Sequence, residues 1–377
     1  MPQNLENLAM LHYFTATGFR CFDEMLFLDF SAVDRQDFSE ALVRNRLVKT
    51  GIVLANSGAG KTALGMAIFD LTRHLTANHV IGSHDPDMSF GSESGMMEFN
   101  YQFRFDEQDL TYAYARSASG DLVYERIIIN GGLYAEVDRR FGGGATILAD
   151  GAEHLKRDFS SSTISIASYI HKNSLLEKNP ANECFKKFIS FAENMLYFSA
   201  THVNSYIGFT KGRIDLGAAI LKNGWLDELV SFLGECGLSY RLTAEKSVGQ
   251  AFIGQRIGNR TMNLLRNTSL GVRKLITFFF WMKIAEAKGK EASFIFIDDM
   301  DGLHHLASGP TFQRALESTA QVLITTTSTS MLTQRDVRPD CCFSLSNGSI
   351  SSFLNRTEKH LRPAHNLERL YRAGAFD

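Results

Sequence analysis

A glycine-rich loop that ends in a lysine and a threonine is the first part of this sequence that could do chemistry. The loop reads Asn56-Ser57-Gly58-Ala59-Gly60-Lys61-Thr62, between an apolar run and an apolar pattern of helical period in residues 51–70. The order strand, loop and helix directs backbone N–H groups and a helix N-terminus at one anion, as a phosphate-binding loop requires. Lys61 would reach the β- and γ-phosphates of ATP, and Thr62 would offer its hydroxyl to Mg²⁺.

The loop departs from the phosphate-binding pattern at one position. The pattern G-x-x-x-x-G-K-[ST] asks for glycine where Ala55 stands. Alanine cannot adopt a positive φ at low cost, so the departure matters if the loop needs that conformation there. A chance glycine-rich turn is the alternative, but the strand before the loop and the helix after it favour a nucleotide site.

A second group of chemical residues follows a short apolar run late in the chain. Phe294-Ile295-Phe296-Ile297 predicts a buried strand of a parallel sheet, and Asp298 and Asp299 follow it. Ligands of open α/β sheets lie at the carboxyl ends of the strands, where these carboxylates fall. We expect Asp298 to bind the metal and Asp299 to position the attacking water. A solvated turn is the alternative.

A possible anion-binding helix start lies just before the acidic strand. Thr268-Ser269-Leu270-Gly271-Val272-Arg273-Lys274 precedes an apolar helix, and Ser269 and Gly271 would expose free N–H groups to an anion. Taken alone, this segment is only a good helix N-cap. Its place before the acidic strand favours a role in the nucleotide site.

Composition limits the classes of protein that fit. The chain has 377 residues, of which 44% are hydrophobic and 21% charged, as in an ordinary globular protein of one large or two smaller domains. A net charge of −2 provides no global attraction for nucleic acid or acidic lipid, so any such contact must be a local patch or belong to a partner. Five cysteines without paired spacing predict a reducing cytoplasm, and we expect no membrane span.

Patterning predicts how the rest of the chain is arranged. We expect a helix from Lys61 to about Ala77, an exposed connection at 85–95, an antiparallel β subdomain at about 96–137 and helical structure through 175–237. In the antiparallel subdomain, Phe99, Tyr101, Phe103 and Phe105 alternate with polar residues, which is typical of a half-buried strand.

The order of these features resembles the ABC-type ATPases of the AAA-like group in prokaryotic anti-phage defence, relatives of the overcoming-lysogenization-defect and SMC-type ATPases. Further segments also look like elements of that group, namely Phe19-Arg20-Cys21-Phe22, Leu64-Gly65-Met66-Ala67-Ile68-Phe69-Asp70 and, in the tail, Arg338-Pro339-Asp340-Cys341, Thr357 to Arg362 and His365 to Phe376. The resemblance spans nearly the whole chain. It implies an α/β fold with an ABC-type P-loop nucleotide-binding domain, an antiparallel β subdomain and an inserted helical lobe.

The resemblance also implies domain limits and partners. The N-terminal part of the ATPase domain would occupy 1–150, the helical lobe 151–260, and the signature segment (Ser269-Leu270-Gly271), acidic strand and switch strand 261–377. Ser269 and Gly271 would contact ATP held by a second copy, in an ATP-dependent homodimer or higher oligomer. A separate effector, such as a nuclease or toxin, would be the partner, and nucleic acid could be reached through the complex.

Two further departures from the family bear on catalysis. Asp299 stands where the family usually has glutamate, and Thr327 stands where a switch histidine is expected. A carboxylate that is shorter by one methylene can misplace a water, and an error of about 1 Å costs on the order of a hundredfold in rate. His305, with His304, could compensate as a catalytic group. We therefore expect an ATPase that could be slow.

Two other functions stay open at this point. An SMC-like DNA-repair ATPase would clamp duplex DNA directly, and it predicts a basic patch and salt-sensitive binding. A pseudo-ATPase scaffold would bind nucleotide only to hold a shape, and the three departures at Ala55, Asp299 and Thr327 favour it.

Overall fold

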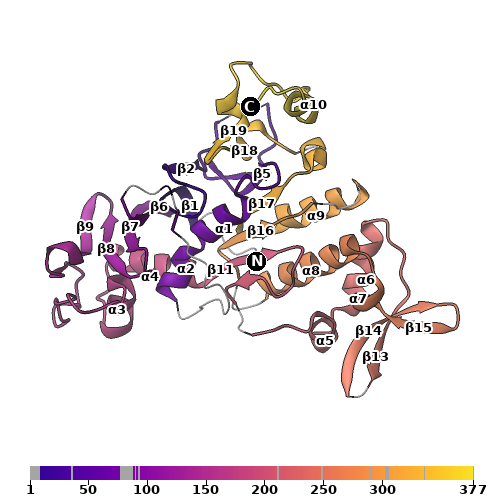
Figure 1. Ribbon diagram of the computed structural model, residues 1–377, viewed down its shortest axis with the longest axis horizontal. Coiled ribbons are helices and arrows are strands. Elements are labelled where there is room, and N and C mark those ends of the chain that lie inside the picture. The colour runs from indigo at the N-terminus through magenta and orange to yellow at the C-terminus, as the bar shows by residue number, and fades with distance from the viewer. Residues whose placement is uncertain are drawn as a thin grey trace.

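The computed structural model describes residues 9–34, 37–76, 88–89, 91, 94–209, 212–247, 249–287, 291–301, 305–334 and 336–376, with only the backbone of residues 305 and 306. Its framework is two seven-stranded sheets (Figure 1). One extended hydrophobic core packs between the sheets and their helices. Within the described residues, no helix combines the length and apolarity that a bilayer crossing requires.

The central sheet is mainly parallel and carries the phosphate-binding loop. Its strand order is β12-β11-β16-β17-β5-β18-β19, and β11, β16, β17, β5 and β18 run parallel. Every residue of β11, β16, β17 and β5 is buried, which explains their nearly continuous apolar sequences. The strands are β5 (Thr50–Leu54), β11 (Met195–Ser199), β12 (Tyr206–Ile207), β16 (Phe294–Asp298), β17 (Gln321–Thr326), β18 (Cys342–Ser346) and β19 (Ser349–Ser352).

The second sheet is antiparallel throughout, in the order β10-β9-β8-β7-β6-β1-β2. The predicted alternation is confirmed, because Phe99, Tyr101, Phe103 and Phe105 of β6 are all buried. The strands are β1 (Met10–Thr17), β2 (Leu26–Asp29), β6 (Met96–Phe105), β7 (Gln108–Ser117), β8 (Leu122–Ile129), β9 (Gly132–Asp138) and β10 (Ala145–Ile147). Strands β3 (Val43–Arg44) and β4 (Leu47–Val48) form a separate small hairpin.

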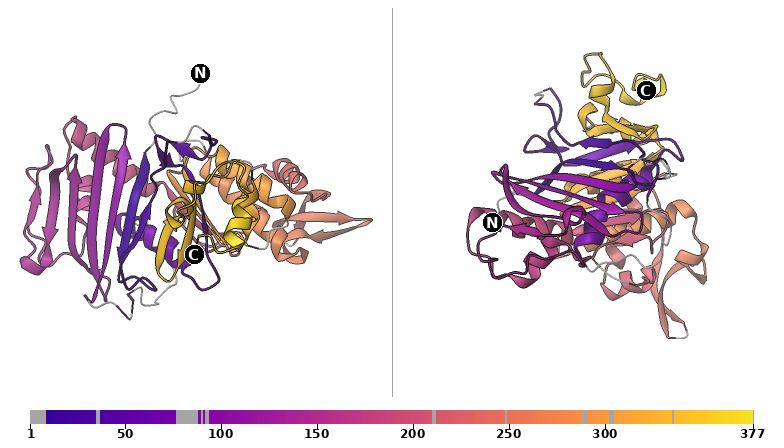
Figure 2. Two further views of the ribbon diagram at one scale, coloured as in Figure 1. Left: turned by 90° about the horizontal axis from the view of Figure 1, so that it is seen from above. Right: turned by 60° about the vertical axis from the view of Figure 1, so that its left-hand side comes forward.

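Helices fill the space beside both sheets (Figures 1 and 2). The phosphate-loop helix α1 packs on β16, α2 and α4 pack together, and α4 also contacts β6 and β7. On the other side, α8 contacts α6 and α9. The helices are α1 (Lys61–Ile68), α2 (Asp70–Leu75), α3 (Ile166–Asn173), α4 (Pro180–Glu193), α5 (Leu216–Lys222), α6 (Leu226–Glu235), α7 (Leu264–Asn267), α8 (Leu270–Ala285), α9 (His305–Glu317) and α10 (Leu367–Arg372).

The structure corrects several details of the sequence interpretation. The helix predicted from Lys61 to Ala77 is interrupted at Phe69 and divides into α1 and α2, and Ala77 lies outside the described residues. Most of the predicted exposed connection at 85–95 also lies outside them, and Ser89, which is described, is buried.

Residues 151–260 are not a purely helical lobe. They contain α3, α4, α5 and α6, but also β11, which is an interior strand of the central sheet. The same segment continues into a three-stranded antiparallel sheet, β13 (Leu242–Ser247), β14 (Gln250–Ile257) and β15 (Arg260–Asn263), which projects from one end of the molecule (Figure 1). The short apolar run Met195–Ser199 was read as part of a helical region because it directly follows a helix and does not alternate. The domain limits at 150 and 260 stay predictions.

Candidate functional site

The phosphate loop adopts conformations that require glycine at two positions. Gly58 and Gly60 have φ values of 82° and 102°, in the left-handed region. A Cβ on Gly60 would also lie 2.8 Å from the Cys21 sulfur. Ala55 is not among the residues with positive φ, and its buried N–H donates to the Thr326 carbonyl at 3.2 Å. The alanine at this position therefore fits the loop without backbone strain.

Lys61 lies over the loop that precedes it. Its side chain is almost fully buried, and its ammonium donates to the carbonyl oxygens of Ala55 and Asn56, both at 3.2 Å. Lys61 is the first residue of α1, so the charge stands beside the N-terminus of that helix. Positive charge and free N–H groups thus converge on the same concave face, as anion binding requires.

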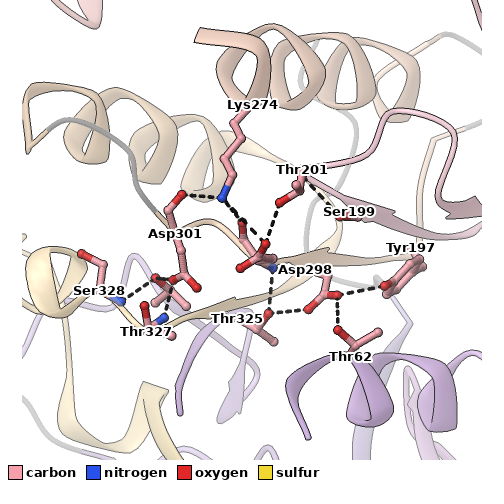
Figure 3. A network of polar contacts seen from close by, with 12 residues as sticks. Thr62, Tyr197, Ser199, Thr201, Lys274, Asp298, Asp301, Thr325, Thr327 and Ser328 are labelled. Atoms are coloured by element: carbon pink, nitrogen blue, oxygen red, sulfur yellow. Dashed lines mark hydrogen bonds and ion pairs between the residues drawn. The ribbon is translucent and has the colours of Figure 1, made fainter. Parts of the chain in front are cut away.

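Asp298 is buried at the end of β16 and accepts three hydrogen bonds from hydroxyl groups (Figure 3). Its Oδ2 accepts from Thr62 at 2.7 Å and from Tyr197 at 3.0 Å, and its Oδ1 accepts from Thr325 at 2.8 Å. Thr62 comes from α1, Tyr197 from β11 and Thr325 from β17. The parallel strands β11, β16 and β17 end at the same edge of the central sheet. This arrangement places the Asp298 carboxylate against the phosphate loop.

The Thr62 hydroxyl and the Asp298 carboxylate suit a magnesium ion. Mg²⁺ prefers oxygen ligands, keeps several waters, and is held in nucleotide sites by one or two carboxylates together with substrate phosphates. Within the described residues no group of three or more His, Cys, Asp or Glu side chains could hold a metal. A single carboxylate beside a hydroxyl fits an ion that takes its remaining ligands from phosphate and water.

Asp299 is held in an unusual backbone conformation at the edge of the pocket. Its φ is 63°, which is uncommon for a residue with a side chain. Its N–H donates to the Thr325 hydroxyl at 3.1 Å, and its Oδ2 accepts from Thr201 at 2.6 Å. Burial, followed by a hydrogen bond with Asp301, raises the pKa of this carboxyl above its usual value.

Asp301 is part of the site, although the sequence reasoning did not select it. Its Oδ1 accepts from the Thr326 hydroxyl at 2.8 Å and from the Thr327 N–H, so it fastens the end of the switch strand (Figure 3). Burial alone would raise the pKa of Asp301, but the hydrogen bonds from Asp299, Thr327 and Thr326 outweigh it and lower the pKa. The available signal was the third carboxylate in Asp298-Asp299-Met300-Asp301.

Lys274 joins the helix of the signature segment to the acidic loop. This buried lysine of α8 donates to the carbonyl oxygens of Asp299 at 3.1 Å and Asp301 at 2.5 Å. Its ammonium also lies 3.7 Å from the Asp299 carboxylate. From the sequence, this lysine was only one of two positive charges near the helix start, whereas the structure directs it at residues 299–301 (Figure 3).

Ser269 caps α8, as predicted. Its side-chain oxygen accepts from the N–H of Val272 at 3.4 Å, and Ser269 itself is exposed. Neither Ser269 nor Gly271 lines the pocket formed by the phosphate loop of its own chain. Their contact with ATP held by a second copy stays a prediction.

The site residues surround a pocket of about 510 Å³, which includes an unpredicted histidine, His202. The Ser199–Ser205 region follows β11, so the strand missed in the sequence supplies one wall. His305 starts α9, but its side chain is not described, and His304 lies outside the described residues. The catalytic role of His305 is therefore untested. The pocket is lined by Ser57, Gly58, Gly60, Lys61, Thr62, Ala63, Tyr197, Ser199, His202, Ser205, Asp298, Asp299 and Asp301.

No family model matches the chain, and no curated protein matches it. Several of the solved structures that resemble this chain do so over most of their lengths. An SMC head domain from Thermotoga maritima is 14% identical, with 90% of this chain and 97% of that chain covered and a TM-score of 0.42. An SMC head bound to the C-terminal winged-helix domain of ScpA is 16% identical, with 90% and 96% covered and a TM-score of 0.45.

The third similar structure is the recombination mediator RecF with an ATP analogue, 14% identical, with 92% of this chain and 99% of that chain covered and a TM-score of 0.41. At such low identities and TM-scores we base no inference about function on these three structures. The assignments that follow rest on the site geometry and on the order of the sequence motifs.

Proposed function

We propose that this chain binds ATP with Mg²⁺ and hydrolyses it slowly, so that nucleotide occupancy acts as a state signal. The observation that carries the proposal is the hydrogen bond of 2.7 Å between the Thr62 hydroxyl and the buried Asp298 carboxylate, beneath a loop with left-handed glycines at 58 and 60. These groups come from two elements far apart in the sequence, and phosphoryl transfer needs them together.

Each side chain has a role that follows from its position. The N–H groups of residues 60–62 and the Lys61 ammonium would bind the phosphates, while the Thr62 hydroxyl and Asp298 would hold the metal. Magnesium supplies neutralisation of the charge that develops on the phosphate oxygens. Asp299 reaches the pocket at the end of the same strand, where it would orient the attacking water.

The contacts of Asp299 support slow turnover. Its carboxylate is shorter than the glutamate of similar ATPases, and Thr201 and Lys274 hold it at 2.6 Å and 3.7 Å. If the Asp299 carboxylate moved further into the pocket, it would lose its contacts with Thr201 and Lys274. Thr327 offers only a hydroxyl where a histidine is expected. A water oriented from an imperfect position reacts more slowly, because rate depends steeply on placement.

We further propose that the chain works as the sensor or scaffold subunit of an anti-phage defence complex that controls a separate nuclease or toxin. The resemblance of its motif order to such ATPases supports this role. The exposed N-cap Ser269, which does not line the pocket of its own chain, supports assembly as an ATP-dependent dimer or higher oligomer.

The oligomer is tested by Ser269→Arg, which places a bulky cation where the partner's γ-phosphate would lie. We expect the variant to bind Mg²⁺-ATP normally as a monomer and to fail to associate, as measured by light scattering with and without saturating ATP. Arg266→Gln, a change at an exposed residue three positions earlier, is the matched control and should associate like the wild type. Equal association of wild type and Ser269→Arg in ATP would remove the role assigned to Ser269.

A pseudo-ATPase scaffold is the second candidate, and the same contacts of Asp299 favour it. If Thr201 and Lys274 keep this carboxylate away from water, ATP would be bound without being hydrolysed. Single-turnover measurement with radiolabelled ATP separates the two. Phosphate release above that of Asp299→Asn supports the slow ATPase, whereas identical traces favour the scaffold.

A further inference from the structure

A basic sheet projects from the end of the molecule that lies farthest from α3 (Figures 1 and 2). It consists of β13, β14 and β15, and we call residues 241–266 the basic ribbon. Contacts of α5 and α7 with β14, and of α6 with β13, fix one part of the ribbon to the body. The remainder extends outward, where a large partner could reach it without meeting the two main sheets.

The ribbon concentrates positive charge in a chain whose net charge is −2. Its five basic residues are all exposed, and Glu245 is its one acidic residue. Glu245 is also engaged, because its carboxylate accepts from the Thr243 hydroxyl at 2.9 Å. The side chains of the basic residues form no ion pair or hydrogen bond with any part of the chain that the structure describes. They are Arg241, Lys246, Arg256, Arg260 and Arg266.

Two of these arginines stand opposite each other, Arg256 on β14 and Arg241 directly before β13. The N–H of Arg256 donates to the carbonyl of Arg241 at 2.9 Å, which continues the register of β13 and β14. Like charges directly opposite on antiparallel strands destabilise a sheet. Arg260 is the first residue of β15, directly after the turn from β14, and it pairs with Ile257. An anionic partner would neutralise both opposed arginines, and the relief of their repulsion would add to the affinity.

The chemistry of the ribbon fits the backbone of a duplex better than single strands. Guanidinium groups match phosphate oxygens in a bidentate geometry. Binding of single strands relies on aromatic platforms, but Phe252 is the one aromatic residue of the ribbon and it is only partly exposed. Within the three-stranded ribbon, β14 and β15 form an antiparallel hairpin, and the major groove of DNA admits a pair of strands of this kind.

We infer that the basic ribbon binds the phosphate backbone of double-stranded DNA. This inference is independent of the proposed hydrolysis, because none of these residues lines the nucleotide pocket. It gives the chain a direct contact with nucleic acid in spite of its overall negative charge. β15 leads through the four-residue helix α7 to Ser269, so the DNA contact adjoins the segment that would close the dimer.

The inference is tested by fluorescence anisotropy of a labelled duplex with the full-length chain at several salt concentrations. Contact of four arginines with phosphate predicts a slope of about −3.6 in a plot of log K against log salt. Arg256→Gln combined with Arg260→Gln should weaken binding and reduce the magnitude of the slope by about 2. Mg²⁺-ATP affinity should not change, which shows that the variant is folded.

The matched control is Arg157→Gln combined with Lys172→Gln, which removes the same charge from exposed residues near α3. This control should keep the wild-type slope. Equal slopes for both double variants would overturn the inference, as would the absence of duplex binding at about 50 mM salt. Preferential binding of a labelled polyglutamate peptide over the duplex would assign the ribbon to an acidic protein instead, and preferential binding of single strands would exclude the duplex.

Discussion

The substitution Gly65→Ala tests how closely the phosphate-loop helix must approach the central sheet. A Cβ at this position would lie 2.5 Å from the ring of Phe296 and 2.8 Å from the ring of Tyr197. Real Cβ contacts are longer, so α1 must move outward or both rings must turn. Overpacking of this kind costs about 1–3 kcal/mol, while replacing a helical glycine by alanine returns at most about 1 kcal/mol. We expect a net loss of about 1–2 kcal/mol in the free energy of unfolding.

The same displacement should weaken nucleotide binding, because α1 carries Thr62 and the Tyr197 hydroxyl bonds Asp298. Urea unfolding followed by circular dichroism measures the stability, and calorimetry measures the affinity for Mg²⁺-ATP. Gly234→Ala in α6 is the matched control, since its Cβ would meet no atom within 4 Å. That control should stabilise the protein by about 0.5–1 kcal/mol. Equal effects of the two substitutions, or unchanged ATP affinity in Gly65→Ala, would refute the close-approach reasoning.

Three further predictions concern the acidic loop and a buried histidine. Lys274→Met should lower the turnover number about tenfold, equivalent to about 1.4 kcal/mol in barrier, with ATP affinity changed less than about twofold, and Lys274→Arg should recover part of the rate in phosphate-release assays. Asp299→Glu combined with Thr327→His should raise turnover about tenfold in the same assay, and a neutral result would contradict the slow-switch explanation. Burial and two nearby arginines lower the pKa of His74 to about 3. Because the unfolded chain binds a proton near pH 6.5 and the native chain does not, the free energy of unfolding should fall as pH decreases from about 6.5, and His74→Gln should flatten that decline in urea titrations.

Local patterns selected several residues that the structure brings together in one pocket, while their roles stay predictions. The phosphate loop, with Gly60 and Lys61, was identified from spacing along the chain, because its function depends on consecutive backbone N–H groups. Asp298 was predicted for a similar reason, since a fully apolar run followed by acidic residues indicates the carboxyl end of a buried parallel strand. The antiparallel sheet was predicted from the strict alternation of apolar and polar residues in its strands.

The missed residues act through contacts that no local pattern records. Lys274 has the sequence context of a helix start, and its direction toward residues 299–301 depends on how α8 packs on the central sheet, where Trp281 stacks on Phe198 of β11. His202 enters the pocket because β11 pairs with β16, a parallel pairing across about a hundred residues. Asp301 was not selected because Asp298 and Asp299, just before it, had already been assigned the metal-binding and water-positioning roles.

The basic ribbon was not foreseen because the whole-chain charge suggested no attraction for nucleic acid. Averaging over 377 residues conceals five exposed basic side chains that a small projecting sheet brings together. Attraction for nucleic acid depends on the charge of a local surface. The surface of the basic ribbon forms only when β13, β14 and β15 pair.

The most direct test of the central claim is calorimetric titration of Mg²⁺-ATP into the wild type and Lys61→Ala. Lys61 is the cation that the loop would offer to the β- and γ-phosphates, and its ammonium now bonds the carbonyl oxygens of Ala55 and Asn56. We predict saturable binding by the wild type and loss of tight binding by the variant, with both proteins folded by circular dichroism. Unchanged affinity in a folded Lys61→Ala protein, or no binding by the wild type, would contradict the assignment of residues 56–62 as a nucleotide site.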